Sequence, residues 1–133
     1  EEYGRFCIPG GMNVPGGDLI LWAEELKQRK DTSIVVNCAG RTRSIIGTAA
    51  LRRLGLTNVR ALRNGTMGWV LAGFELEQRP KRNTSAPPAG DETMALARRI
   101  ADEEKISWIS SESLAHVIET KRMNYIIDVR SDA

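Results

Sequence analysis

The chain has 133 residues, the size of one compact domain, and an apolar fraction of 41% that suffices for a hydrophobic core. No segment approaches the ~18 consecutive apolar residues of a transmembrane helix, and we expect no membrane partner. The net charge of +2, from 19 basic and 17 acidic residues, argues against nucleic-acid binding driven by bulk charge.

Helix and strand patterns alternate through the first half of the chain, which is typical of an α/β fold. The expected elements are a helix over 18–28, a strand over 33–37, a helix over 44–54, a strand over 59–62 and a short helix over 67–72. Asp18 is the expected N-cap of the first helix, and Gly55 is the expected stop of the second. Asn64-Gly65 marks a turn. This pattern predicts a central parallel sheet flanked by helices.

Residues 78–90 differ in composition, because they hold three of the five prolines, and we interpret them as a linker. The apolar pattern after this linker predicts a helix over 91–104, a strand over 106–109, a helix over 111–119 and a strand over 125–129.

The sequence contains two cysteines, Cys7 and Cys38, which are too few for a disulfide scaffold. The first residues lack the basic and then apolar pattern of a secretory signal. With so few cysteines we take a reducing cytoplasm as the default location, where a reactive thiol stays usable.

The loop over 38–44 has a residue pattern that indicates a reactive cysteine. Cys38 follows an expected strand and precedes an expected helix, and the residues after it are Ala39, Gly40, Arg41, Thr42, Arg43 and Ser44. Ligands of open α/β sheets bind beyond such strand ends. Inward-turned backbone N–H groups, the helix N-terminus and two arginines all stabilise a thiolate, which is the nucleophilic form of cysteine.

This loop resembles the active-site loop of rhodanese domains. Two further segments resemble the same family in the expected order: 8–15, and 58–65 with the following Trp69. Together these matches cover roughly residues 1–77, and they imply a rhodanese-like fold.

The resemblance implies sulfur transfer. Cys38 would take the outer sulfur of thiosulfate or a similar anionic donor as a persulfide, and a thiol or cyanide would then accept it. Residues 39–44 would bind the donor, with the arginines attracting it and the hydroxyls of Thr42 and Ser44 adding hydrogen bonds. No metal or organic cofactor is implied.

Two alternatives stay open. A phosphatase or arsenate-reductase-like enzyme uses Cys-x5-Arg, but the residue six places after Cys38 is Ser44, and Arg43 falls one place short. The shorter loop suits a sulfur atom better than a phosphate group. The other alternative is a non-catalytic rhodanese-like module that binds or regulates a partner.

The family normally opens with a β-α-β part whose second strand ends Asp-Val-Arg, and this pattern appears at Asp128-Val129-Arg130 instead. We therefore interpret 1–77 as the C-terminal portion of one rhodanese-like repeat, 78–90 as a linker, and 91–133 as a linking helix and the first β-α-β part of the next repeat. Either circular permutation within the chain or a swapped homodimer would complete the sheet.

Other side chains receive structural interpretations. Cys7 stands where the family commonly has a histidine, and we interpret it as structural, with a resolving thiol as the alternative. His116 has no partner pattern for a triad or a metal site. Trp22, Trp69 and Trp108 are expected in the core. Asp128 and Arg130 match the structural strand end of the family, and we expect a salt bridge between them, or one that supports the loop, rather than a catalytic role.

Overall fold

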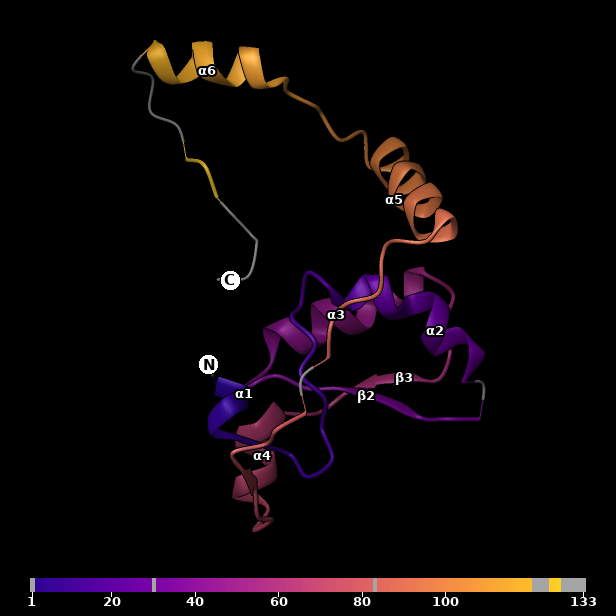
Figure 1. Ribbon diagram of the computed structural model, residues 1–133, viewed down its shortest axis with the longest axis vertical. Helices are drawn as coiled ribbons and strands as arrows, with labels where there is room; N and C mark the ends of the chain where they lie inside the picture. Colours follow the sequence, from indigo (N-terminus) through magenta and orange to yellow (C-terminus); the bar gives the residue numbers. More distant parts are fainter. Residues whose placement is uncertain (1, 30, 83, 121–124, 128–133) are drawn as a thin grey trace.

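The computed structural model describes residues 2–29, 31–82, 84–120 and 125–127 of the chain. Figure 1 shows a body built from the first half of the sequence and an arm that leads away from it, formed by α5 (Asp91–Glu103) and α6 (Ser111–Glu119). The predicted Asp128–Arg130 salt bridge lies outside the described residues.

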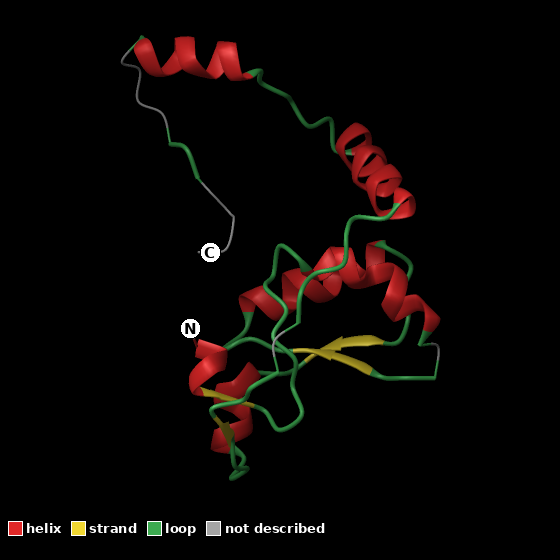
Figure 2. Cartoon of the chain, in the orientation of Figure 1, coloured by secondary structure: helices red, strands yellow, loops and turns green. Residues whose placement is uncertain are grey.

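Two parallel strands form the centre of the body. β2 (Ile34–Val36) pairs with β3 (Val59–Ala61), with Ile34 opposite Val59. α2 (Ala23–Gln28) and α3 (Thr42–Arg53) lie over one face of this pair (Figure 2). The predicted α/β class with a parallel sheet is confirmed, and both strands lie within the predicted ranges.

The core lies between these helices and the strands. Ala23, Leu51, Leu56 and Val59 are buried together, and Leu51 is fully buried. Their packing removes apolar surface from water and fixes α3 against the β2–β3 pair. On the opposite face of β2, the side chain of Val35 is 57% exposed. The sheet is therefore covered by helices on one side only in the part of the chain that the structure describes.

The observed bounds of the helices can be compared with the predicted ones. α3 begins at Thr42, two residues before the predicted start, and Gly55 follows its C-cap with a φ of +93°, a conformation that glycine adopts without strain. The first predicted helix is divided into a 3₁₀ turn, η1 (Leu19–Trp22), and α2. Asp18 is the N-cap residue of η1, as predicted, but its side chain makes no capping hydrogen bond.

Three short elements were not predicted. They are α1 (Glu2–Arg5), β1 (Phe6–Cys7) and β4 (Glu77–Gln78). β1 and β4 form an antiparallel pair in which Cys7 lies opposite Glu77. Two-residue strands carry no periodicity, so only the contact between distant segments reveals them. α4 (Gly65–Leu71) begins two residues before the predicted short helix.

α5 is attached to α2 by side chains. Glu24 Oε1 accepts hydrogen bonds from Thr93 N (3.1 Å) and Thr93 Oγ1 (3.0 Å), and Lys27 Nζ lies 2.7 Å from Glu92 Oε1. Thr93 belongs to the first turn of α5, so the Glu24 carboxylate satisfies a helix N–H that otherwise lacks an acceptor. α5 is thereby held against the body.

The rest of the arm makes few contacts with the body. The strand predicted over 106–109 is wrong, since these residues are irregular and Trp108 is 82% exposed rather than in the core. The described part of the other predicted strand, 125–127, is also irregular and exposed. A strand needs a neighbouring chain segment for its backbone hydrogen bonds, and the described residues pair no strand with these segments.

The parallel sheet of the described residues consists of β2 and β3, and α6 lies away from it (Figure 1). The described residues after 78–90 therefore add no strand to this sheet, and its completion by permutation or swapping stays a prediction. Within the ranges that the structure describes, no helix combines the length and the apolar character needed to cross a membrane.

Candidate active site

Cys38 lies where the sequence pattern places it, in the loop between the end of β2 and the start of α3. Its side chain is half-buried. β2 ends at Val36, two residues before Cys38, and α3 begins at Thr42, four residues after it. The first N–H groups of a helix have no intrahelical acceptor, so they remain available to an anion at this position.

Ser44 lies in the first turn of α3 and is fully buried. Its Oγ lies 3.5 Å from Cys38 Sγ and donates a hydrogen bond to the carbonyl oxygen of Arg41 at 2.9 Å. The Ser44 hydroxyl thus faces the thiol from inside the protein, and its contact with a sulfur donor stays a prediction.

The surroundings of Cys38 favour the thiolate. Burial by itself would raise the pKa of the thiol, but hydrogen bonds from the Ser44 hydroxyl and from the backbone N–H groups of Ser44 and Gly40, together with the charge of Arg43, outweigh it. The pKa of Cys38 is consequently lowered from its ordinary value. A larger fraction of the thiol is then ionised near neutral pH, as a sulfur nucleophile requires.

The remaining loop residues face solvent to different degrees. Ala39, Arg41, Thr42 and Arg43 are exposed, and Gly40 is partly buried. Arg43 Nη2 lies 3.0 Å from Glu2 Oε2, in a pair whose side chains are 67% and 69% exposed. Such an exposed pair is weak, so the guanidinium remains available to an anion.

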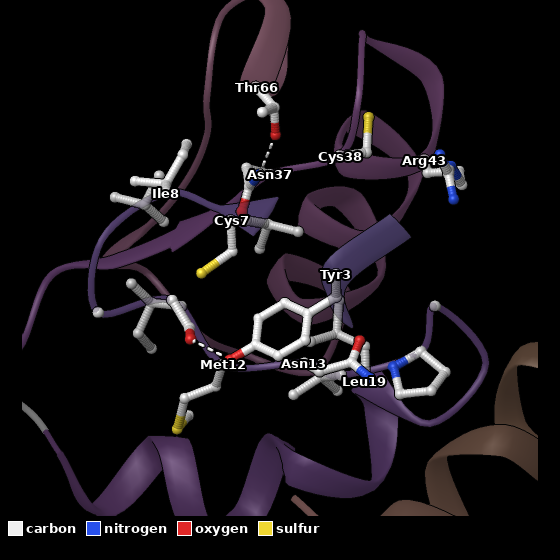
Figure 3. Close-up of a pocket in the computed structure, with 18 of the residues that line it drawn as sticks. Tyr3, Cys7, Ile8, Met12, Asn13, Leu19, Asn37, Cys38, Arg43 and Thr66 are labelled. Atoms are coloured by element: carbon white, nitrogen blue, oxygen red, sulfur yellow. Dashed lines mark hydrogen bonds between the residues drawn. The ribbon is translucent and has the colours of Figure 1, made fainter. Parts of the chain in front are cut away.

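Sequence reasoning missed the first turn of α4, which supports the Cys38 loop from the other side. Thr66 N donates to the Cys38 carbonyl at 2.9 Å, and Met67 N donates to the Ala39 carbonyl at 3.1 Å. Asn37 Nδ2 also donates to Thr66 Oγ1 at 3.1 Å (Figure 3). The Asn64-Gly65 turn is visible in the sequence, but its contact with the loop depends on the fold.

A cavity of about 680 Å³ adjoins the site. Of the predicted site residues, Cys38, Ala39 and Arg43 line it, whereas Gly40, Arg41, Thr42 and Ser44 do not. Its other walls come from residues 2–16, the first helical region and β2. Space for a small anion therefore lies directly beside the thiol.

Cys7 lines the same cavity but has different neighbours. It is buried, and its sulfur lies 3.6 Å from Arg82 Nη2 and 4.0 Å from Glu77 Oε2. Hydrogen bonds from Arg82 and from Gly10 N lower the pKa of Glu77. Figure 3 shows the sulfur atoms of Cys7 and Cys38 pointing in different directions. This arrangement fits the structural interpretation of Cys7.

His116 lies on α6, outside the body that carries Cys38. Among the described residues, no group of three or more His, Cys, Asp or Glu side chains could hold a metal ion.

Comparison with known proteins identifies the family of the chain. The profile of the rhodanese-like domain matches residues 1–72, and the chain belongs to the rhodanese-like domain family. No curated protein matches the chain significantly.

Among solved structures, the chain is similar to the crystal structure of thiosulfate sulfurtransferase from Pseudomonas aeruginosa, with 43% sequence identity and a TM-score of 0.77. The match covers 89% of this chain and 23% of that one. The likeness thus extends beyond residues 1–72, and the chain spans about a quarter of the length of that enzyme.

Proposed function

We propose that this chain is a sulfurtransferase that carries a sulfane sulfur on Cys38. The observation that supports this most directly is the lowered pKa of a half-buried cysteine whose sulfur lies beside backbone N–H groups and an adjoining cavity. The similarity to a thiosulfate sulfurtransferase supports thiosulfate as the donor.

In the first step the Cys38 thiolate attacks the outer sulfur of thiosulfate. A new bond forms between Sγ and that sulfur, the sulfur–sulfur bond of thiosulfate breaks, and sulfite leaves with the bonding electron pair. The loop N–H groups that stabilise the thiolate also suit the terminal sulfur of the resulting persulfide anion. Arg43 lines the cavity and Arg41 is exposed in the same loop. The positive charges of both side chains attract the anionic donor.

In the second step a thiolate or cyanide attacks the terminal sulfur of the persulfide. The bond from that sulfur to Cys38 Sγ breaks, the thiolate is regenerated, and the acceptor leaves as a persulfide or as thiocyanate. The two half-reactions predict ping-pong kinetics.

The decisive experiment is the intact mass of the protein after incubation with thiosulfate, for wild type, Cys38→Ser and Cys7→Ser. We expect wild type and Cys7→Ser to gain the mass of one sulfur atom, reversed by dithiothreitol, and Cys38→Ser to gain none. A gain that persists in Cys38→Ser and disappears in Cys7→Ser would refute the assignment.

The absence of any gain in folded wild-type protein would favour the non-catalytic binding module. Hydrolysis of a phosphate ester that depends on Cys38 would favour the phosphatase-like alternative, which the short loop disfavours. Each alternative therefore has its own readout.

The division into repeats, the swapped homodimer and the cytoplasmic location stay predictions. Large apolar side chains are exposed along the arm, and they are Ile106, Trp108, Ile109, Ile118, Tyr125, Ile126 and Ile127. If the arm of one copy covers the open face of β2 in another, light scattering of purified protein will give the mass of a dimer. The variant Trp108→Ser with Ile118→Asp will then give that of a monomer.

A further inference from the structure

We propose that the first turn of α4 orients the anion-binding loop, with the N–H groups of Thr66 and Met67 fixing two loop carbonyls and Gly65 acting as the positioning residue that permits this approach. This inference rests on the proposed function for its role in catalysis, but its geometry stands apart from any substrate.

The argument begins with the planarity of the peptide bond. In a trans peptide the carbonyl oxygen of one residue and the N–H of the next point in opposite directions. Met67 N binds the Ala39 carbonyl at 3.1 Å, and this contact also sets the direction of the Gly40 N–H. The Gly40 N–H is one of the backbone groups that bind the Cys38 sulfur.

The same reasoning applies one residue earlier. Thr66 N binds the Cys38 carbonyl at 2.9 Å, which fixes the peptide plane that joins Cys38 to Ala39. Both donors belong to the first turn of α4, where helix N–H groups have no partner within the helix. The helix therefore uses its free donors to turn the loop carbonyls away from the sulfur.

Gly65 is needed because the two backbones approach so closely. A Cβ built at this position would lie 2.0 Å from the Cys38 carbonyl oxygen and 2.7 Å from that of Gly40. The residue is buried and has a φ of +56°, which L side chains rarely adopt. Backbone atoms cannot move aside as a flexible side chain can, so any larger residue separates α4 from the loop.

The test is the pH dependence of Cys38 alkylation by iodoacetamide, in a Cys7→Ser background so that only one thiol reports. We expect Gly65→Ala to raise the midpoint of the rate profile by about one pH unit, the size of shift that lost hydrogen bonds to a thiolate produce. Gly4→Ala is the control, because a Cβ there meets nothing within 4 Å. Its midpoint should equal that of the parent protein.

A second pair of variants, both at Met67, tests the backbone N–H of that residue separately from Gly65. Met67 is 59% exposed, so its side chain contributes little packing. Met67→Pro removes the N–H that binds Ala39, and proline is tolerated in the first turn of a helix. Met67→Ala keeps the N–H, so the midpoint of Met67→Pro should lie above that of Met67→Ala.

A measurement on unmodified protein covers the case in which the variants do not fold. The amides of Thr66 and Met67 should exchange with deuterium more slowly than free first-turn amides, because both are bound to carbonyls. Fast exchange, or unchanged alkylation midpoints in folded Gly65→Ala and Met67→Pro, overturns the proposal. Since alkylation involves no sulfur donor, failure of persulfide formation with shifted midpoints would refute only the function.

Discussion

The Oγ of Ser44 lies 3.5 Å from the Sγ of Cys38, and the hydroxyl has one hydrogen for two acceptors. While Cys38 is protonated, its thiol donates to Ser44, and Ser44 donates to the Arg41 carbonyl at 2.9 Å. Once the thiol is ionised, the hydroxyl can rotate and donate to the sulfur. The buried serine thus stabilises both protonation states, and the charged one more strongly.

Ser44→Ala should therefore make Cys38 less acidic. Loss of a hydrogen bond to the thiolate raises its pKa, so the alkylation midpoint should move upward by about half a unit to one unit. The free energy of unfolding should fall by about 1 kcal/mol, because the Arg41 carbonyl loses one of its two donors and keeps only Ile45 N. Exposed Ser107→Ala provides the comparison. An unchanged midpoint in a folded Ser44→Ala protein would contradict the role of the hydroxyl.

The lowered pKa of Cys38 also predicts how stability depends on pH. The pKa is lower in the folded protein than in the unfolded chain, whose ordinary value is 9.0, so between the two values the unfolded chain binds more protons. The contribution is fully present above pH 9.0 and is lost as the pH falls through the folded pKa. Urea unfolding should show wild type gaining stability relative to Cys38→Ser as the pH rises through this window. A constant difference would disprove the shift.

Arg43 lines the cavity and should act on an anionic donor mainly through its charge. With Arg43→Gln we expect KM for thiosulfate to rise several-fold at low salt and kcat to change less. Added salt should narrow the difference from wild type, since exposed charges are screened beyond ~10 Å at 0.1 M ionic strength. Arg52→Gln removes the same charge from the last turn of the same helix. Equal effects of the two variants would mean that net charge alone matters.

The core beneath the site should be sensitive to truncation at Leu51, which is fully buried on α3. Leu51→Ala should lower the free energy of unfolding by about 2–5 kcal/mol, through lost apolar burial and the cavity left behind. Ile46 lies on the same helix and is 64% exposed, so Ile46→Ala should cost less than about 0.5 kcal/mol. Chemical denaturation of both variants measures the difference, and similar losses would count against the packing described.

Local patterns were sufficient for the α/β order of the body and for the position of Cys38. β-branched residues in β2, the helical spacing in α3 and the glycine after α3 act within a few residues of each other. Asp18 occupies the predicted N-cap position, although its side chain makes no capping hydrogen bond. The strand predicted over 106–109 was wrong, because a strand depends on a neighbouring strand that the local sequence does not reveal.

The sequence by itself determined that Cys38 follows a strand and precedes a helix, with Arg41 and Arg43 close behind it. Only the tertiary structure decided which groups reach its sulfur and what holds the loop. Ser44 turns inward to the thiol, and α4 reaches back from beyond β3 to bind the carbonyls of Cys38 and Ala39. These contacts join segments separated by up to 28 residues, and hydrogen bonds of that kind form only after the strands and helices have packed.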